Sequence, residues 1–136
     1  MTLVIDASVA LKWVLAEDGS SAADLLLDQE LIAPELWMIE AANALWRRVS
    51  RGALTAPEAE ERLLELSNAP VASIPITDDI FAAAGLSSSM DHPVYDCLYI
   101  ALAQRENTTL ITADTRLFNK AQRYQNLAPV VRLLGS

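Results

Sequence analysis

Short apolar runs alternate with longer segments of helical periodicity along the whole chain. The apolar runs are rich in Val and Ile and are bounded by polar or turn-forming residues, which is typical of buried strands. One of them contains Pro75 and is therefore expected at a sheet edge. Strands are predicted at residues 2–6, 31–33, 71–76, 109–112 and 130–133.

Helices are predicted between these strands, where apolar residues recur every three or four positions. Thr55 and Glu58 have the spacing of a capping box with Pro57 in the first turn, and Gly52 is a plausible C-cap of the preceding helix. The helices are predicted at residues 8–16, 20–27, 35–50, 55–67, 77–86, 91–106 and 115–123. Side-chain N-caps are also expected from Ser20 or Ser21 and from Thr77 or Asp78.

The alternation of strands and helices predicts an α/β fold in one domain, residues 1–136, with a mainly parallel sheet covered on both faces. The first strand ends at Asp6, and the fourth is followed by Asp114. Parallel strands share a carboxyl end, and ligands of open α/β sheets bind at that edge. We therefore expect these two carboxylates to lie on the same side of the sheet.

Composition narrows the class of protein. Apolar residues make up 52% of the 136 positions, which fits a globular domain. The single cysteine, Cys97, rules out an internal disulfide and makes the cytoplasm the expected compartment. No apolar run is long enough for a membrane span, and no basic stretch precedes the first apolar residues, so neither a membrane nor a signal peptide is expected.

The net charge of −8 argues against nonspecific binding of nucleic acid. It indicates either a solvated acidic surface or a group of acids that binds cations. Four acids stand at strand ends or within apolar stretches of helix, where a solvated acid is not expected: Asp6, Glu40, Asp96 and Asp114.

Each acid also has an ordinary structural interpretation. Asp6 and Asp114 could be helix N-caps, and Asp96 could be a first-turn acid favoured by the helix dipole. Glu40 could lie on an exposed face, paired with Arg47. The coexistence of all four in one α/β domain favours a shared site instead.

Convergence of four carboxylates would require a cation. Two of them about 5 Å apart repel by roughly 3 kcal/mol at an effective dielectric near 20, and each raises the pKa of the other. Oxygen-only ligands select Mg²⁺ or Mn²⁺, whereas one His and one Cys give poor support for zinc. Because substrate phosphates usually complete the shell of Mg²⁺, an all-acid cluster indicates phosphoryl chemistry.

The four acids lie in segments that read VIDAS, IEAANAL, YDCLYIALAQREN and LITADTRL, in that order. Together these segments resemble the PIN domain, specifically the VapC-like ribonuclease toxins of toxin–antitoxin modules. The resemblance covers almost the whole chain. It implies that all four acids form the catalytic metal site, that Ser8 and Thr112 fall on hydroxyl positions beside it, and that Asn43 is a companion of Glu40.

The resemblance further implies a five-stranded parallel sheet and Mg²⁺- or Mn²⁺-dependent cleavage of RNA. It implies a homodimer and a cognate VapB-like antitoxin, whose C-terminal segment wraps the toxin and offers an Arg or Lys to the acidic cleft. As a mechanism, Asp6 and Asp96 would hold metal directly, and Glu40 and Asp114 directly or through water. A bound water would attack in line, leaving 5′-phosphate and 3′-hydroxyl ends.

The metal-free route through the RNA 2′-hydroxyl normally needs an acid and a base such as two histidines, and His92 is alone. Lys12, Arg47 and Arg48 could hold flanking phosphates, or could be ordinary helix-surface cations. The aromatic side chains are interpreted as packing residues: Trp13, Trp37, Trp46 and the pair Tyr95 and Tyr99.

Rival functions remain at this point. A phosphatase of the haloacid dehalogenase type needs a second acid at position 8, which is Ser, and a receiver domain needs paired acids at the first strand, where Ala7 follows Asp6. A PIN nuclease of RNA processing, or a PIN module that binds RNA or a partner without cutting, stays open.

Overall fold

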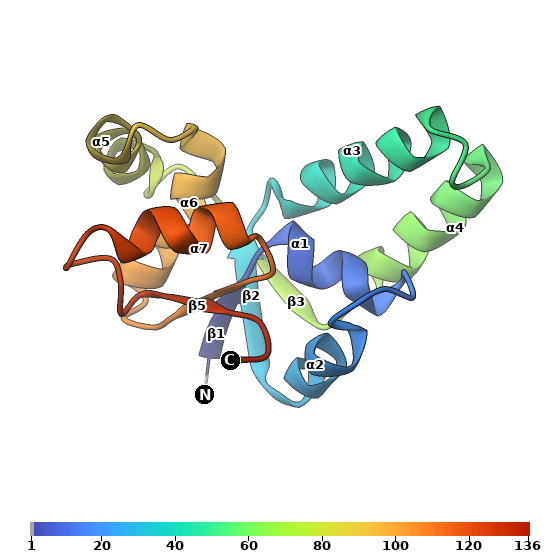
Figure 1. Ribbon diagram of the computed structural model, residues 1–136, viewed down its shortest axis with the longest axis horizontal. Coiled ribbons are helices and arrows are strands. Elements are labelled where there is room, and N and C mark those ends of the chain that lie inside the picture. Colours follow the sequence, from blue (N-terminus) through green and yellow to red (C-terminus); the bar gives the residue numbers. More distant parts are fainter. Residues whose placement is uncertain (1) are drawn as a thin grey trace.

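Five parallel strands form one sheet in the computed structural model, which describes residues 2–136 (Figure 1). This confirms the predicted α/β fold and its parallel, five-stranded sheet. The strand with Pro75 beyond its end lies at an edge, as expected. In order across the sheet the strands are β3 (Val71–Ile74), β2 (Glu30–Pro34), β1 (Thr2–Ile5), β4 (Leu110–Thr112) and β5 (Val131–Leu133).

The helices connect these strands in chain order. The predicted helix at residues 8–16 is shorter than expected, because the chain tightens into a 3₁₀ turn after one α-helical turn. The helices are α1 (Ala7–Ala10) with the 3₁₀ turn η1 (Leu11–Trp13), α2 (Ser20–Leu25) with η2 (Leu26–Asp28), α3 (Trp37–Ser50), α4 (Ala56–Ser67), α5 (Ile80–Met90), α6 (Val94–Arg105) and α7 (Thr115–Gln122).

The chain runs outward from β1 to β2 and β3, and then crosses to β4 and β5 on the other side of β1. Crossovers between parallel strands are right-handed, so connections that run in opposite directions lie on opposite faces of the sheet. Helices α1–α4 and α5–α7 therefore cover the two faces. Helix α6 packs against β1, β2 and β4, and its residues 97–103 are all buried, Cys97 among them.

The helix ends test the predicted caps. The Thr55 capping box is present, since Thr55 N–H donates to Glu58 at 2.9 Å and Glu58 N–H donates to Thr55 Oγ1 at 3.2 Å. Gly52 follows α3 with a φ of 76°, as a glycine C-cap should. The predicted caps of α2 are wrong, because its N-cap is Gly19 and the Ser20 hydroxyl instead donates to the carbonyl of Leu15.

The predictions for α5 are also wrong at both ends. Neither Thr77 nor Asp78 caps it, since Asp79 occupies the N-cap position and no side chain makes the capping bond. The helix does not end near Leu86 but continues through Gly85 to Met90, which is fully buried. Packing of α5 on α6 outweighs the low helix propensity of glycine.

The aromatic residues divide between core and surface. Trp37 is buried and Trp13 is half-buried, whereas Trp46 is 60% exposed. No helix within residues 2–136 combines the length and the apolar character that crossing a membrane requires.

Candidate functional site

The site lies where β1 and β4 end side by side. Val4 pairs with Leu110 and Ile5 with Ile111, so this register brings Asp6 next to Thr112. The chain leaves β1 toward one edge of the sheet and leaves β4 toward the other edge. A crevice opens at such a switch point in α/β sheets, and it is the usual place for a ligand.

Asp6 is buried, with 5% of its surface exposed, and two hydroxyls hold its carboxylate. Ser8 Oγ donates to Oδ1 and Thr112 Oγ1 donates to Oδ2, each at 2.5 Å. The backbone N–H groups of Ala113 and Asp114 in turn donate to the two hydroxyls, at 2.9 and 3.0 Å. This network leaves each hydroxyl proton directed at Asp6, and it fixes the orientation of the carboxylate.

Burial raises the pKa of Asp6 to about 6, although the hydrogen bonds from Ser8, Thr112 and Val9 lower it and the charge of Asp96 adds a smaller increase. Asp6 also caps α1 by accepting a bond from the N–H of Val9 at 3.3 Å. Asp6 can therefore be both the N-cap of α1 and an acid of the site, because the cap uses only part of the carboxylate.

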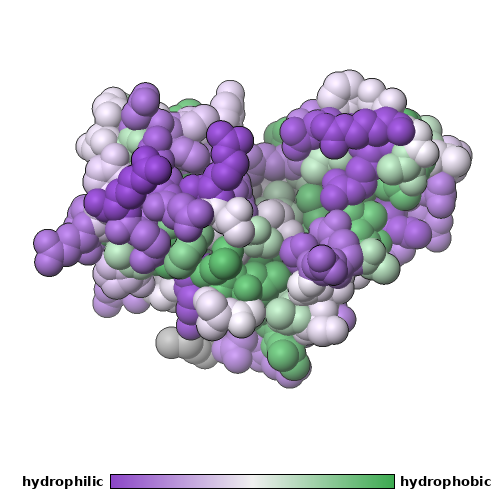
Figure 2. Space-filling view, viewed as in Figure 1, coloured by the Kyte–Doolittle hydropathy of each residue, from purple (hydrophilic) through white to green (hydrophobic). Residues whose placement is uncertain are grey.

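The structure brings all four predicted acids into one pocket. The pocket has a volume of about 200 Å³ and is lined by Asp6, Glu40, Asp96 and Asp114 together with Ala7, Ser8, Leu11, Ala44 and Arg47. The acids come from the ends of β1 and β4 and from the first turns of α3 and α6. In Figure 2 a notch opens between the α3 side and the α6–α7 side of the molecule, at the edge of the sheet where these segments begin.

Glu40 has a partner that sequence reasoning missed. The hydroxyl of Tyr99 donates to Glu40 Oε1, and no bond joins Glu40 to Arg47. Burial raises the pKa of Glu40, and the charges of Asp96 and Asp6 raise it further. Tyr99 is fully buried, and burial followed by the charge of Glu40 raises the pKa of its phenol far above the ordinary value, so it remains a donor.

The interpretation of Tyr95 and Tyr99 as a packing pair is wrong. Tyr95 is 61% exposed, whereas Tyr99 points inward at Glu40. A signal for Tyr99 was present in the sequence: it lies three residues after Asp96, and so on the same face of a helix.

The other two acids are also held. His92 Nε2 lies 2.7 Å from Asp96 Oδ2, so His92 is a neighbour of the site. Asp114 Oδ1 accepts bonds from the N–H groups of Arg116 at 2.9 Å and Leu117 at 3.2 Å, which makes it the N-cap of α7. Its second oxygen is left for another ligand.

The donor set fits a hard divalent cation, because it consists entirely of carboxylate oxygens. Among residues 2–136, no three Asp, Glu, His or Cys side chains lie close enough together to bind one ion by themselves. Mg²⁺ is usually bound through one or two carboxylates and completes its shell with water and substrate phosphates. A cation bound in this way would offset the unfavourable burial of Asp6 and Glu40.

The predicted basic residues lie in two places. Arg47 lines the acid pocket, whereas Lys12 and Arg48 both pair with Glu17, at 3.2 and 3.3 Å. Asn43 lies in an adjoining hollow, which Glu40 and Arg47 also line. The geometry thus places Arg47 beside the four acids and Asn43 beside Glu40, but does not bring Lys12 or Arg48 to the acid pocket. The roles of the basic residues toward RNA remain predictions.

Comparison with known proteins identifies the family and agrees with the fold. The PIN domain model matches residues 3–123. Ribonuclease VapC3 of Pyrobaculum aerophilum is 35% identical over 129 residues, an alignment that covers 88% of this chain and 95% of that protein.

Two solved structures share the fold. One is PAE2754 from Pyrobaculum aerophilum, with a TM-score of 0.71, 20% identity and coverage of 88% of this chain and 79% of that one. The other is VapBC2 from Rickettsia felis bound to a DNA fragment from the promoter, with a TM-score of 0.67, 15% identity and coverage of 98% of both chains. The resemblance drawn from the four acidic segments is confirmed: the chain belongs to the PIN domain family and is VapC-like within it.

Proposed function

We propose that this protein is a metal-dependent endoribonuclease that acts as the toxin of a toxin–antitoxin pair. One observation carries the proposal: four carboxylates from distant parts of the chain line a single pocket, and burial raises the pKa values of two of them. Similarity to a protein named a VapC ribonuclease supports RNA as the substrate.

Asp6 and Asp96 are the proposed direct ligands of Mg²⁺ or Mn²⁺, with Glu40 and Asp114 as direct or water-mediated ligands. When bound, the metal would polarise the scissile phosphate and lower the pKa of a water molecule that attacks it. Ser8 and Thr112 keep Asp6 oriented, and Tyr99 keeps Glu40 oriented. Arg47, at the rim of the pocket, is placed to contact a phosphate oxygen of the substrate.

An antitoxin partner is supported by the Rickettsia felis VapBC2 structure and by a toxin–antitoxin complex from Klebsiella pneumoniae, whose TM-score is 0.58 at 19% identity over 85% of this chain and 89% of that chain. The α3–α4 pair offers surface for such a partner or for a second copy in a homodimer. It carries an apolar hollow of about 250 Å³ beside Trp46, and Ile39 and Leu64 on the same two helices are also exposed.

The direct test is cleavage of RNA by the purified protein with Mg²⁺ or Mn²⁺ and with excess EDTA. We expect cuts that carry 5′-phosphate and 3′-hydroxyl ends, and none in EDTA. Full cleavage in EDTA, or products with 2′,3′-cyclic phosphates, would contradict the mechanism.

A non-toxin PIN nuclease and a silent PIN module are separated from the toxin by an experiment in cells. We expect induced expression of the wild type, with sequencing of RNA 5′ ends, to give growth arrest and discrete cuts that Asp6→Asn removes. Cuts without growth arrest would indicate RNA processing, and absence of cuts would indicate a silent module.

A further inference from the structure

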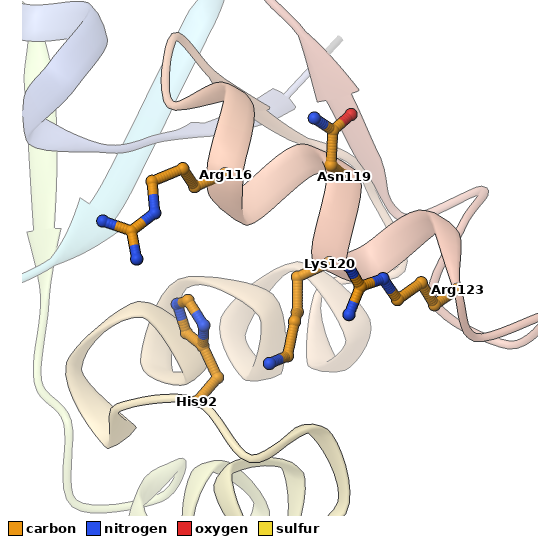
Figure 3. A pocket seen from close by; sticks show the side chains of 5 residues that line it. All are labelled: His92, Arg116, Asn119, Lys120 and Arg123. Atoms are coloured by element: carbon orange, nitrogen blue, oxygen red, sulfur yellow. The ribbon is translucent and has the colours of Figure 1, made fainter.

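A second cavity, of about 310 Å³, lies beside the acid pocket and has the opposite charge. It is lined by His92, Arg116, Asn119, Lys120 and Arg123. Figure 3 shows His92 on the connection between α5 and α6, facing the side of α7 from which Arg116 and Lys120 extend. The three cations lie four and three residues apart, which places them on one face of α7.

In the part of the chain that the structure describes, these three cations form no ion pair, whereas four of the other seven Lys and Arg side chains do. Within residues 2–136, no carboxylate forms an ion pair with Arg116, Lys120 or Arg123, and Lys120 Nζ donates only to the carbonyl of Asp91, at 3.2 Å. Lys12, Arg48, Arg62 and Arg105 are all paired. The chain has a net charge of −8, so carboxylates outnumber cations. Three cations without an ion pair around one cavity therefore indicate a place for an external anion.

Helix electrostatics do not account for the whole cluster. Lys120 lies in the last turn of α7 and Arg123 is its C-cap, where cations interact favourably with the helix dipole. Arg116 lies in the first turn, where a cation is unfavourable. Like charges on one helix face also repel, so an anion in the cavity would stabilise all three.

Two contacts join this cavity to the acid pocket. His92 lines the basic cavity, and its Nε2 is 2.7 Å from Asp96 in the acid pocket. The backbone N–H of Arg116 donates to Asp114, another acid of the pocket, at 2.9 Å. An anion in the basic cavity would therefore be a close neighbour of a phosphate held at the acids.

We propose that the cavity between α7 and His92 binds a backbone phosphate of the same RNA strand, beside the phosphate that is cleaved. The inference rests on the proposed function for the identity of the strand. It assigns the electrostatic contact with flanking RNA to Arg116, Lys120 and Arg123, in place of the sequence-based candidates Lys12 and Arg48, which share an ion pair with Glu17.

The test is the salt dependence of binding to a labelled single-stranded RNA of mixed sequence, measured by fluorescence anisotropy in EDTA so that no cleavage is needed. Each phosphate contact contributes about 0.7 to the slope of log K against log salt for single strands. Because the cavity is proposed to hold one phosphate, we expect Lys120→Gln/Arg123→Gln to reduce the slope by about 0.7. Arg62→Gln/Arg132→Gln, with the same change in net charge but outside the cavity, should retain the wild-type slope.

Equal effects of the two double variants would overturn the proposal, because they would show a response to net charge alone. An unchanged slope in both variants, or no RNA binding by the wild type, would also overturn it. A third result would also overturn it: inorganic phosphate stabilises the wild type, but Lys120→Gln/Arg123→Gln does not change RNA binding. The cavity would then hold a free anion and not the RNA. If RNA binds as expected but no metal supports cleavage, the proposed function fails while the phosphate site stands.

Discussion

Two aspartates of this protein are equally buried but differ in their surroundings. Asp6, at the end of β1, is 5% exposed, and Asp79, before α5, is 4% exposed. Asp79 receives two bonds from the guanidinium of Arg105, from Nε to Oδ1 at 2.8 Å and from Nη2 to Oδ2 at 3.0 Å. Asp6 receives hydroxyl and backbone donors, and the charge that affects its pKa is the negative charge of Asp96.

This difference makes Asp79 a structural residue and Asp6 a residue of the candidate site. The Asp79 region contains its own cation, so the buried charge is neutralised within the fold and connects the start of α5 to the end of α6. The Asp6 region contains several acids, and within residues 2–136 no Lys or Arg forms an ion pair with any of the four. The hydrogen bonds to Asp6 only partly offset its burial. A buried carboxylate without an internal cation is disfavoured as an anion, and a cation from outside would offset that cost.

The largest expected effect is on catalysis, in Asp6→Asn. We expect it to reduce RNA cleavage by on the order of 10³-fold or more, because it removes a charged metal ligand while keeping the shape of the side chain. Asp79→Asn, the matched change at the other buried aspartate, should cleave at close to the wild-type rate per folded molecule. Single-turnover cleavage at saturating metal measures both, and equal losses would remove the distinction between the two regions.

The next effect concerns stability against pH in the metal-free protein. The pKa of Asp6 is raised from 3.8 to about 6 in the folded state, so between these values the folded protein binds more protons than the unfolded chain. Stability should therefore fall as pH rises from about 4 to about 6, by up to about 3 kcal/mol from this group. The raised pKa of Glu40 acts in the same direction.

Urea unfolding in EDTA at several pH values measures this dependence. Asp6→Asn should flatten the slope, and added Mg²⁺ should recover stability at neutral pH in the wild type only. If the wild type and Asp6→Asn show the same dependence of stability on pH through this window, Asp6 ionises as freely as a surface acid.

A smaller loss of stability is expected when Arg105, the cation that pairs with Asp79, is removed. Arg105→Gln leaves Asp79 buried without its partner, and should cost about 2 kcal/mol of unfolding free energy; the 39% exposure of the Arg105 side chain keeps this below the value for a fully buried pair. Asp79→Asn/Arg105→Gln should recover most of the loss. If the double variant is as unstable as the single one, the pair does not act by charge compensation.

The smallest effect is expected at the hydroxyl that holds Glu40. Tyr99→Phe should weaken Mn²⁺ binding and cleavage by about tenfold, because groups that orient a ligand typically contribute 10–100-fold. Tyr95→Phe, one turn away and exposed, is the matched control and should leave both unchanged. Equal values for the two variants would mean that Glu40 needs no orientation from Tyr99.

The comparison also explains which features the sequence could reveal. Asp6 and Asp114 were found because each follows an apolar run, and a parallel sheet brings such strand ends together. Asp79 and its partner were missed, since Arg105 lies 26 residues away and their contact depends on how α5 packs against α6. The Tyr99–Glu40 bond spans 59 residues for the same reason.

Charge and cap chemistry were less predictable than strand order. Lys12, Arg48 and Arg116 are all helix cations in the sequence. Only the fold shows that the first two pair with Glu17, whereas the third lines the cavity beside α7. The end of α5 was misplaced because the burial of Met90 depends on tertiary packing rather than on the local pattern around Gly85.

The most direct measurement is the number of protons released when the protein binds Mn²⁺, obtained by calorimetry in buffers of different ionisation enthalpy. At about pH 5.5, below the raised pKa of Asp6, we expect the wild type to bind Mn²⁺ with release of protons, and at about pH 8 with almost none. Asp6→Asn should bind more weakly and release fewer protons at the lower pH. No binding at millimolar Mn²⁺, or binding at about pH 5.5 with no proton released, would contradict the conclusion that these buried carboxylates require an external cation.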